Sequence, residues 1–259
     1  VMLSLIPVKL EDCLPAYCRY AASLRLVDTF WDDMILQAEL FRIAEDGKEL
    51  GFVSRKRPED LLTSFFLHNN AVFRLAEVFS YVKGILHPTG ARVVTGDETF
   101  LSAALDHARH VEPQAFFFDL TDQKAAPPAF PRAWFYEAQE ADLPELQETG
   151  FYHPAVIGNP ENRIFVMRRP DGMFMGTGHI ARSPFNRSWG AVGMYTAPGF
   201  RRTGVGRSMI LFLTEITKEM GLTPICGCYC QNHASRRTLE SCGYASRTRY
   251  LNLYFEEKL

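Results

Sequence analysis

The sequence lacks the features that mark membrane-spanning or secreted proteins. No apolar run approaches the ~20 residues needed to span a bilayer, and residues 1–15 show no basic leader followed by a long apolar stretch. The six cysteines are not spaced like the paired framework of a small secreted domain. We therefore expect reduced thiols and a cytoplasmic location.

An excess of charge of one sign is also missing. The chain has 28 basic and 30 acidic side chains, a formal net charge of −2, so no overall basic field favours nucleic acid or an anionic membrane. Among its 259 residues 47% are hydrophobic, which is enough for a substantial core. The length permits one large domain or two of moderate size. We expect no nucleic-acid partner and no membrane partner.

Three of the cysteines, Cys226, Cys228 and Cys230, alternate along a probable strand. Alternate side chains on a strand share one face, so the pattern indicates either a metal site or three small apolar groups packed together. One-residue spacing on a flat strand does not converge on a tetrahedral ion. We favour packing and predict no metal site.

The clearest seam in the chain is the segment 121–131, TDQKAAPPAFP. Consecutive prolines disfavour both helix and central strand, so this segment reads as a linker. It divides the chain into two predicted domains, residues 1–125 and 126–259.

Turn signals and hydrophobic periodicity define the elements of the second domain. A turn at Asp171-Gly172 joins two apolar runs and predicts a hairpin. Asp142 with Pro144 predicts a capped helix start, and residues 204–220 form an amphipathic helix closed by Gly221. The other predicted elements are strands at 133–138, 189–196, 225–229 and 249–255 and a helix at 234–242.

The first domain shows a similar order of elements. Its predicted helices are 11–24, 71–85 and 99–110, and its predicted strands are 35–44, 49–53, 62–67, 91–95 and 115–120. A strand, a strand, a helix and a strand separate the turn Asp46-Gly47 from Asp97. The same order separates Asp171-Gly172 from Asn232. We infer that the first domain is a degenerate copy of the second; an unrelated α/β domain of similar size is the alternative.

A loop with two glycines, Arg201-Arg202-Thr203-Gly204-Val205-Gly206, lies between a predicted strand and the long helix. The first N–H groups of a helix lack internal partners, and the helix dipole adds positive potential there. The glycines let a pyrophosphate approach the backbone, Arg201, Arg202 and Arg207 supply cationic donors, and Ser208 offers a hydroxyl. The loop lacks the Gly-Lys-Ser/Thr ending of a nucleoside-triphosphate loop and the three-glycine spacing of a dinucleotide fingerprint.

Two ordered motifs carry a family resemblance. Arg201-x-x-Gly204-x-Gly206 resembles the Gln/Arg-x-x-Gly-x-Gly/Ala signature of GNAT superfamily acetyltransferases, and the residues from Met194 to Phe200 resemble that family's strand end and proline turn. Downstream, residues 232–244 resemble its fifth strand and fourth helix. The resemblance implies an acetyl-CoA-dependent N-acyltransferase with a mixed α/β, largely antiparallel sheet flanked by helices. The first domain is then expected to have a degenerate GNAT-like fold.

The resemblance also implies where acetyl-CoA binds. In the family the sheet splays between its fourth and fifth strands, here 189–196 and 225–229, and the pantetheine arm pairs with backbone groups at the splay. A backbone N–H there would stabilise the developing oxyanion. The implied cofactor-binding residues are Met194, Tyr195, Thr196, Arg201, Arg202, Thr203, Gly204, Val205, Gly206, Arg207, Ser208, Asn232, Ser235 and Arg236. Arg236 is the least specific of them, because a solvated surface charge is an equal alternative.

The family resemblance implies direct attack by an amine without a covalent enzyme intermediate. Leu239 stands where many members carry a tyrosine that protonates the departing thiolate, so another residue or solvent serves, or the activity is lost. His179, with an ordinary pKa near ~6.5, and Tyr195 are the candidate catalytic residues. A half-buried structural histidine and a core tyrosine are the alternatives.

The expected acyl acceptor follows from analogy with tandem members of the family. Tandem members such as glycine acyltransferase and mycothiol synthase suggest a small-molecule amine acceptor, with the first domain packed against the catalytic one as a wall of the acceptor cleft. The first domain's own loop, 68–73, has no glycine and should not admit a pyrophosphate. A polar loop at 154–162, next to His153, is a candidate acceptor contact.

Other readings remain open. Four arginines, Arg168, Arg169, Arg182 and Arg187, favour an anionic acceptor. The alternatives to an enzyme are a catalytically degenerate CoA-binding module and a protein-interaction module. We expect a monomer or a homodimer.

Overall fold

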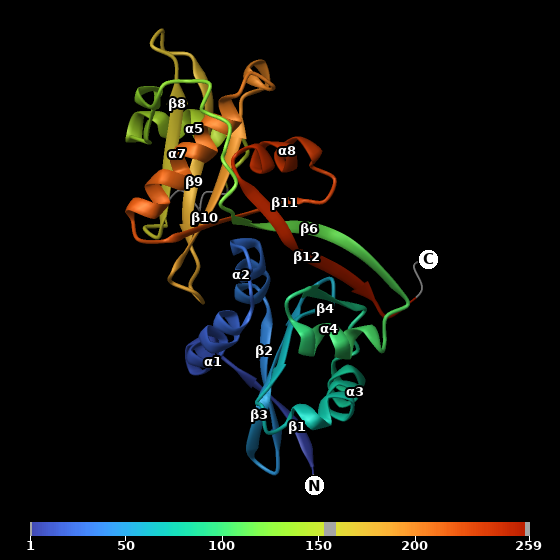
Figure 1. Ribbon diagram of the computed structural model, residues 1–259. Coiled ribbons are helices and arrows are strands. Elements are labelled where there is room, and N and C mark those ends of the chain that lie inside the picture. Colours follow the sequence, from blue (N-terminus) through green and yellow to red (C-terminus); the bar gives the residue numbers. More distant parts are fainter. Residues whose placement is uncertain (1, 153–158, 257–259) are drawn as a thin grey trace. The chain divides into compact units, whose positions relative to one another are not determined.

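The computed structural model describes residues 2–152 and 159–256, which form two compact units (Figure 1). The first unit comprises residues 1–117 and 248–259, and the second comprises residues 118–247. The chain therefore returns to the first unit at its C-terminal end. No helix in the described ranges is long and apolar enough to cross a membrane.

The first unit is built on a sheet of six strands. Neighbouring strands are antiparallel except β4 and β5, which run parallel and pair only through Leu61 with Gly90 and Leu62 with Ala91. The last strand enters this sheet through its C-terminal part, where Tyr250 pairs with Val94. In spatial order the strands are β1 (Leu3–Val8), β2 (Glu39–Glu45), β3 (Lys48–Lys56), β4 (Leu61–Leu67), β5 (Gly90–Val94) and β12 (Tyr244–Tyr254).

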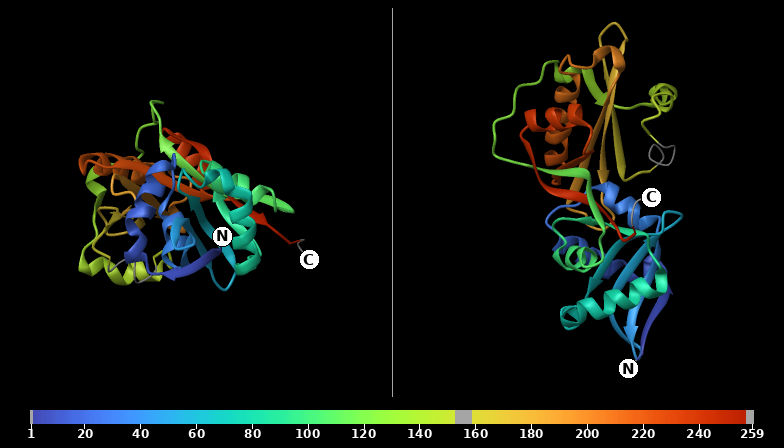
Figure 2. Two further views of the ribbon diagram at one scale, coloured as in Figure 1. Left: turned by 90° about the horizontal axis from the view of Figure 1, so that it is seen from below. Right: turned by 90° about the vertical axis from the view of Figure 1, so that its right-hand side faces the viewer.

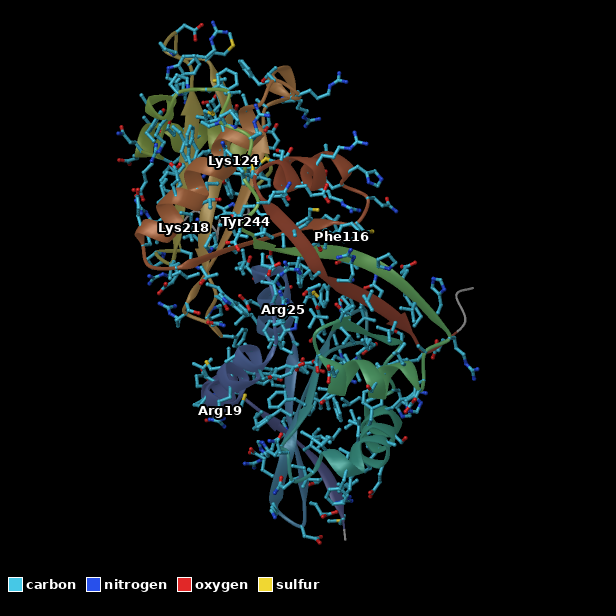
Figure 3. The ribbon with its side chains drawn as sticks, in the orientation of Figure 1. Arg19, Arg25, Phe116, Lys124, Lys218 and Tyr244 are labelled. Carbon is cyan, nitrogen blue, oxygen red and sulfur yellow. The ribbon has the colours of Figure 1, made fainter. Side chains whose placement is uncertain are left out.

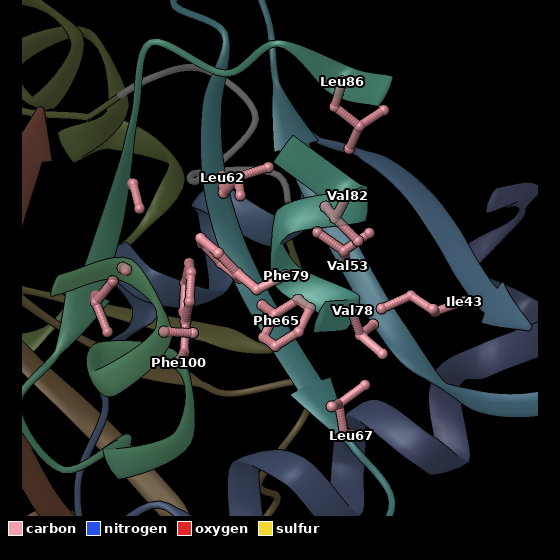
Figure 4. Packing of buried hydrophobic residues seen from close by; sticks show 14 of the residues in the cluster. Ile43, Val53, Leu62, Phe65, Leu67, Val78, Phe79, Val82, Leu86 and Phe100 are labelled. Carbon is pink, nitrogen blue, oxygen red and sulfur yellow. The ribbon is translucent and has the colours of Figure 1, made fainter. Parts of the chain in front are cut away.

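Helices cover both faces of this sheet. They are α1 (Leu10–Ser23), α2 (Thr29–Leu36), α3 (Leu75–Leu86), which follows the 3-10 turn η1 (Val72–Arg74), and α4 (Glu98–Leu105). Phe65 of β4 contacts Phe79 of α3 and Phe100 of α4 (Figure 4). The next residue, Phe66, contacts Tyr20 of α1. Because neighbouring residues of a strand point to opposite faces, α1 lies on the face opposite α3 and α4.

The second unit contains a five-stranded sheet. Strands β7 to β10 are antiparallel in chain order, and β11 runs parallel to β10. Strand β6 (His110–Leu120) leads into the second unit, and the segment 121–131 after it contains no helix or strand. The five strands are β7 (Phe135–Glu137), β8 (Asn162–Arg168), β9 (Phe174–Arg182), β10 (Trp189–Thr196) and β11 (Thr223–Tyr229).

Two helices lie on opposite faces of β8 to β10 (Figure 2). The helices of this unit are α5 (Leu143–Glu148), after the 3-10 turns η2 (Arg132–Trp134) and η3 (Glu140–Asp142), α7 (Val205–Glu219), after η4 (Pro198–Phe200), and α8 (His233–Ser241). Leu146 of α5 packs with Ile164 and Val166 of β8. On the other face, Phe212 of α7 contacts Phe135, which stacks on Phe165 of β8.

The predicted fold class and the repeated element order are confirmed. Strands β3, β4 and β5 with helix α3 lie between the first turn and Asp97, and β9, β10 and β11 with α7 lie between the second turn and Asn232. Each of these two residues then caps a helix: Asp97 Oδ1 accepts from Phe100 N at 3.1 Å, and Asn232 Oδ1 accepts from Ser235 N at 3.0 Å.

Several local predictions are wrong. The strand predicted at 249–255 already begins at Tyr244, and the helix predicted at 71–85 begins at Leu75, after a 3-10 turn. Three further differences concern the start of β2, the end of α4 and the role of Asp142. The strand predicted from residue 35 begins only at Glu39, because Asp28 caps α2 by accepting from Phe30 N at 3.1 Å and that helix continues to Leu36. The helix predicted over 99–110 ends at Leu105. Asp142 does not cap α5; its carboxylate accepts from Gln139 N at 3.0 Å and caps the preceding 3-10 turn.

Candidate functional site

The loop between β10 and α7 forms a helix start with a bare backbone. Gly204 adopts a left-handed conformation, with φ of 94°, and α7 begins at Val205. The first backbone N–H groups of that helix therefore have no intrahelical acceptor. A Cβ at Gly206 would lie 3.2 Å from Met194 Cε and from Thr196 Oγ1, so only glycine leaves this surface open.

Three arginines lie at this helix start. Arg201 and Arg202 are exposed, and neither side chain has an ion pair or hydrogen bond with a described residue. Arg207 buries its Nε without an acceptor in the described ranges. Most other arginines of the second unit are neutralised by a carboxylate, namely Arg163, Arg168, Arg169, Arg187, Arg236 and Arg247. Three cations without a carboxylate partner among the described residues thus lie together at the N-terminus of α7.

Strands β10 and β11 separate beside this loop. Their pairing ends at Ala191 with Ile225, so the last five residues of β10, 192–196, have no partner on β11. Ala197 N donates to Met175 O of β9 at 3.0 Å. Because backbone groups alternate in direction along a strand, Met194 and Thr196 point theirs away from β9, into the widening gap.

The side chains of this strand end divide between two faces. Met194 and Thr196 lie next to Gly206, on the side of α7. Tyr195 lies on the other side, with its ring centroid 5.8 Å from that of Phe151. Tyr195 therefore belongs with the opposite face of the sheet rather than with the loop.

Ser235 and Arg236, the two residues of α8 predicted to bind the cofactor, differ in their contacts. The backbone N–H of Ser235 is taken by the side chain of the exposed Asn232. Arg236 Nε donates to Glu240 Oε1 at 2.8 Å, an i,i+4 pair on the surface. An exposed pair of this kind is weak, so an anionic ligand can compete for the guanidinium.

Ser208 is turned toward the segment 121–131. The residue is fully buried, and its Oγ accepts from Ala129 N at 2.9 Å and from Phe130 N at 3.2 Å while it donates to Gly204 O at 3.0 Å. A Cβ at Gly204 would lie 2.6 Å from Ala129 Cβ. This segment is therefore fastened to the start of α7, and no local sequence signal announces the contact.

The side chain of His179 lies against bare backbone on the face opposite α7. Strand pairing sets His179 beside Gly193, where a Cβ would lie 2.4 Å from the histidine Cε1. The ring centroids of Phe151 and Tyr152 are 5.9 and 5.6 Å away. Its Nδ1 is buried with no hydrogen-bond partner in the described ranges. Burial lowers the pKa of His179 to about 4, so the imidazole is neutral at pH 7 and can accept a proton.

Neither Leu239 nor Cys242 supplies proton or acyl chemistry. Leu239 is buried and apolar. Burial raises the pKa of the Cys242 thiol to about 11, so a nucleophilic thiolate is disfavoured there. Of the alternating cysteines, Cys226 is buried, and Cys228 and Cys230 are half-buried.

The residues suggested as acceptor contacts are only partly described. Residues 153–158, including His153 and most of the loop at 154–162, lie outside the described ranges. In the rest of that loop Glu161 pairs with Arg187 at 3.0 Å. Arg168 and Arg169 are also paired with carboxylates, whereas Arg182 buries an Nε with no acceptor among described residues.

Two matches to known protein families cover the chain. Residues 9–121 match the family described as Acetyltransferase (GNAT) domain, and residues 123–244 match the Acetyltransferase (GNAT) family. The first match confirms that the first half is a copy of the same fold. No curated protein sequence matches the chain.

Solved structures share the whole architecture at low sequence identity. An acetyltransferase from the GNAT family from Colwellia psychrerythraea superposes with a TM-score of 0.84 at 17% identity, over 99% of this chain and 100% of that one. A tandem GNAT protein from the clavulanic acid biosynthesis pathway gives a TM-score of 0.67 at 11% identity, over 100% of both chains. A GCN5-related N-acetyltransferase from Sphaerobacter thermophilus gives 0.58 at 12% identity, over 99% and 97%. The chain therefore belongs to the GNAT acetyltransferase family and carries two GNAT domains in tandem.

Proposed function

We propose that the second unit transfers an acetyl group from acetyl-CoA to the primary amine of a small-molecule acceptor, by direct attack. One observation carries the proposal. Three features occur at one place: the bare helix start at Gly206, three arginines (Arg201, Arg202 and Arg207) that have no carboxylate partner among the described residues, and the separation of β10 from β11. Family membership implies acyl transfer from acetyl-CoA, and the site fits that substrate.

The loop residues would hold the pyrophosphate of acetyl-CoA. Backbone N–H groups at the start of α7 point toward an anion bound there, and the helix dipole favours its charge. Arg201 and Arg202 add charged donors without first breaking an ion pair. Along the gap, the backbone groups of Met194 and Thr196 offer strand-like hydrogen bonds to the amides of the pantetheine arm.

The opposite face of the sheet would receive the amine. The amine attacks as the free base, and neutral His179 accepts the proton that the nitrogen loses as it bonds to the thioester carbonyl, directly or through a water. Tyr195 can orient the amine with its hydroxyl. When bound, acetyl-CoA supplies an acetyl thioester whose thiolate, with an ordinary pKa near ~8.5, is a good leaving group. The buried Leu239 is therefore compatible with turnover without a side-chain acid.

A second candidate function is a CoA-binding module without catalysis. The observation that favours it is Leu239, because this buried apolar residue stands where many family members carry a proton donor. The two candidates share the cofactor and differ in whether free thiol is released when an amine is present.

Thermal unfolding with and without acetyl-CoA tests the cofactor site. At about 100 times its dissociation constant, a ligand that binds only the native state stabilises it by about 2.7 kcal/mol. Gly206→Trp should abolish this shift, because an indole would occupy the bare surface beside Met194 and Thr196. Gly84→Trp, at a helical glycine with no neighbour within 4 Å of a Cβ, should keep it.

Thiol release then separates the two candidates. The wild-type protein should release thiol from acetyl-CoA in the presence of small primary amines, and Gly206→Trp should not. A thermal shift with no thiol release from any amine supports the binding module. The absence of a shift at high acetyl-CoA rejects both candidates.

A further inference from the structure

The first unit contains a cavity of about 460 Å³, within the size range of small-molecule sites, ~300–1,000 Å³. Its walls come from α1, from the end of β4 with the loop that follows, and from the start of α4. The side chains that matter for its chemistry are Arg19, Tyr20, Phe66, Asn69, Val72 and Asp97.

The cavity occupies the place in the first unit that corresponds to the proposed cofactor site of the second. It lies at the end of β4 and beside Asp97, as the other site lies at the end of β10 and near Asn232. The loop here carries no glycine, and His68 Nε2 contacts Glu49 Oε1 at 2.8 Å. A cavity is therefore retained while the chemistry for binding a pyrophosphate is missing.

The inner end of the cavity carries a carboxylate without a counter-charge. Asp97 is only 4% exposed. Its Oδ1 accepts from Phe100 N at 3.1 Å, and its Oδ2 accepts from the hydroxyl of Tyr20. Both partners are neutral, and no described cationic side chain comes within 4.0 Å of the carboxylate. Buried carboxylates are ordinarily paired with a cation, so a cationic ligand group would supply what the protein does not.

The mouth of the cavity carries the opposite charge. Arg19 is exposed on the surface of α1 (Figure 3), and its guanidinium has no ion pair or side-chain hydrogen bond with a described residue. Between the two charged ends the walls are apolar and aromatic. The ring of Phe66 stacks on Tyr20 with centroids 4.3 Å apart, and Val72 adds an aliphatic surface.

We propose that this cavity binds a small zwitterion with an apolar body, such as an amino acid or an amino-acid derivative. The ligand's ammonium lies against Asp97 and Tyr20, its anionic group binds Arg19, and its body packs on Phe66 and Val72. The aromatic faces of the wall add a favourable environment for the ammonium. The site is separate from the acetyl-CoA loop and does not depend on the function proposed for it.

Three probes with one body and different charges test the assignment by isothermal titration calorimetry on the full chain. Phenylalanine carries both charges, 2-phenylethylamine only the ammonium, and 3-phenylpropionate only the carboxylate. Phenylalanine should bind most tightly. The propionate should bind at least about tenfold more weakly than 2-phenylethylamine. The contact that it lacks is with the buried Asp97, whereas the contact that the amine lacks is with the exposed and solvent-screened Arg19.

Substitutions locate each charge. Asp97→Asn retains a good helix-capping side chain, as Asn232 shows in the second unit. It should weaken both amines about tenfold and leave 3-phenylpropionate unaffected. Arg19→Gln should remove the advantage of phenylalanine over 2-phenylethylamine and weaken 3-phenylpropionate, and it should leave 2-phenylethylamine unaffected. Arg109→Gln, an exposed arginine of the same unit outside the cavity, should change nothing.

Several results would overturn the proposal. Equal affinity for 3-phenylpropionate and 2-phenylethylamine would remove the role of Asp97, as would unchanged amine binding in a folded Asp97→Asn variant. Binding of none of the three probes would reject the site. Displacement of phenylalanine by coenzyme A in the Gly206→Trp variant would identify the cavity as a cofactor site instead.

Discussion

The two units carry the same strand, loop and helix but fill them with different side chains. In the second unit the segment 201–207 at the start of α7 holds two glycines and three arginines, and these arginines have no carboxylate partner in the described part of the chain. In the first, the path from β4 to α3 holds no glycine, and its histidine is engaged with Glu49. A few side chains thus decide which ligand a duplicated fold can accept, because the backbone scaffold alone does not specify a site.

A second contrast lies on the face opposite the long helices. His179 of β9 lies against Gly193 of β10 and offers a titratable group. In the first unit Ser54 follows the turn Asp46-Gly47 at the same separation as His179 follows Asp171-Gly172, and it pairs with Ser64 of β4. Their hydroxyls are 2.6 Å apart, and Tyr17 OH lies 2.9 Å from Ser64 Oγ. The first unit therefore places a sealed hydroxyl network where the second places the imidazole that we propose as the base.

The largest expected effect comes from removing that base. His179→Ala should lower kcat for amine acetylation by about 10²- to 10⁴-fold, the usual contribution of a general base, with little change in acetyl-CoA binding. Ser54→Ala, at the corresponding position of the first unit, should leave kcat unchanged. Steady-state kinetics measure both variants. A His179→Ala enzyme with wild-type kcat would mean that the proton leaves by another route.

The free energy of unfolding should change with pH in opposite directions in the two units. Burial lowers the pKa of His179 from 6.5 to about 4, so the unfolded chain binds more protons in that window. The second unit then loses stability as pH falls from about 6.5 to 4. Burial raises the pKa of Asp97 from 3.8 to about 6, so the first unit gains stability as pH falls through that range. Each contribution is at most about 3 kcal/mol.

Matched variants assign these slopes. His179→Gln should reduce the loss of stability of the second unit as pH falls, and Asp97→Asn should reduce the gain of the first. Chemical denaturation between pH 4 and 7 measures both. If both variants shifted the slope in the same direction, the burial assigned to one of the two groups would be wrong.

A smaller effect is expected where the segment 121–131 meets α7. Ser208→Ala leaves the N–H groups of Ala129 and Phe130 without their acceptor, which should lower the free energy of unfolding by about 1–3 kcal/mol. Ser80→Ala, at an exposed position on α3, should stay within about 0.5 kcal/mol of wild type. A Ser208→Ala protein as stable as wild type would show that this contact does not fasten the segment.

Much of the second unit could be predicted because its signals are local. The boundaries of β10, the start of α7 directly after Gly204 and the hairpin turn at Gly172 follow from periodicity and glycine placement. Helix α2 was missed because the cap at Asp28 precedes a segment whose apolar residues continue into a strand. A local pattern cannot divide such a run.

The side-chain partners in the site could not be predicted, because they come from distant parts of the chain. Ser208 has a hydroxyl suited to an anion, yet Ala129 and Phe130 occupy it. The burial that lowers the pKa of His179 accompanies rings from Phe151 and Tyr152, which no spacing in the sequence places there. The structure is likewise needed to show that the arginines of the loop have no carboxylate partner among the described residues, whereas other arginines such as Arg168 and Arg187 do.

The most direct test of the contrast between the units is the stoichiometry of acetyl-CoA binding, measured by calorimetry on the wild type and two variants. The account predicts one acetyl-CoA per chain, unchanged by Asn70→Trp in the loop of the first unit and abolished by Gly206→Trp in the second. Two molecules per chain, or binding that survives Gly206→Trp and disappears in Asn70→Trp, would contradict it.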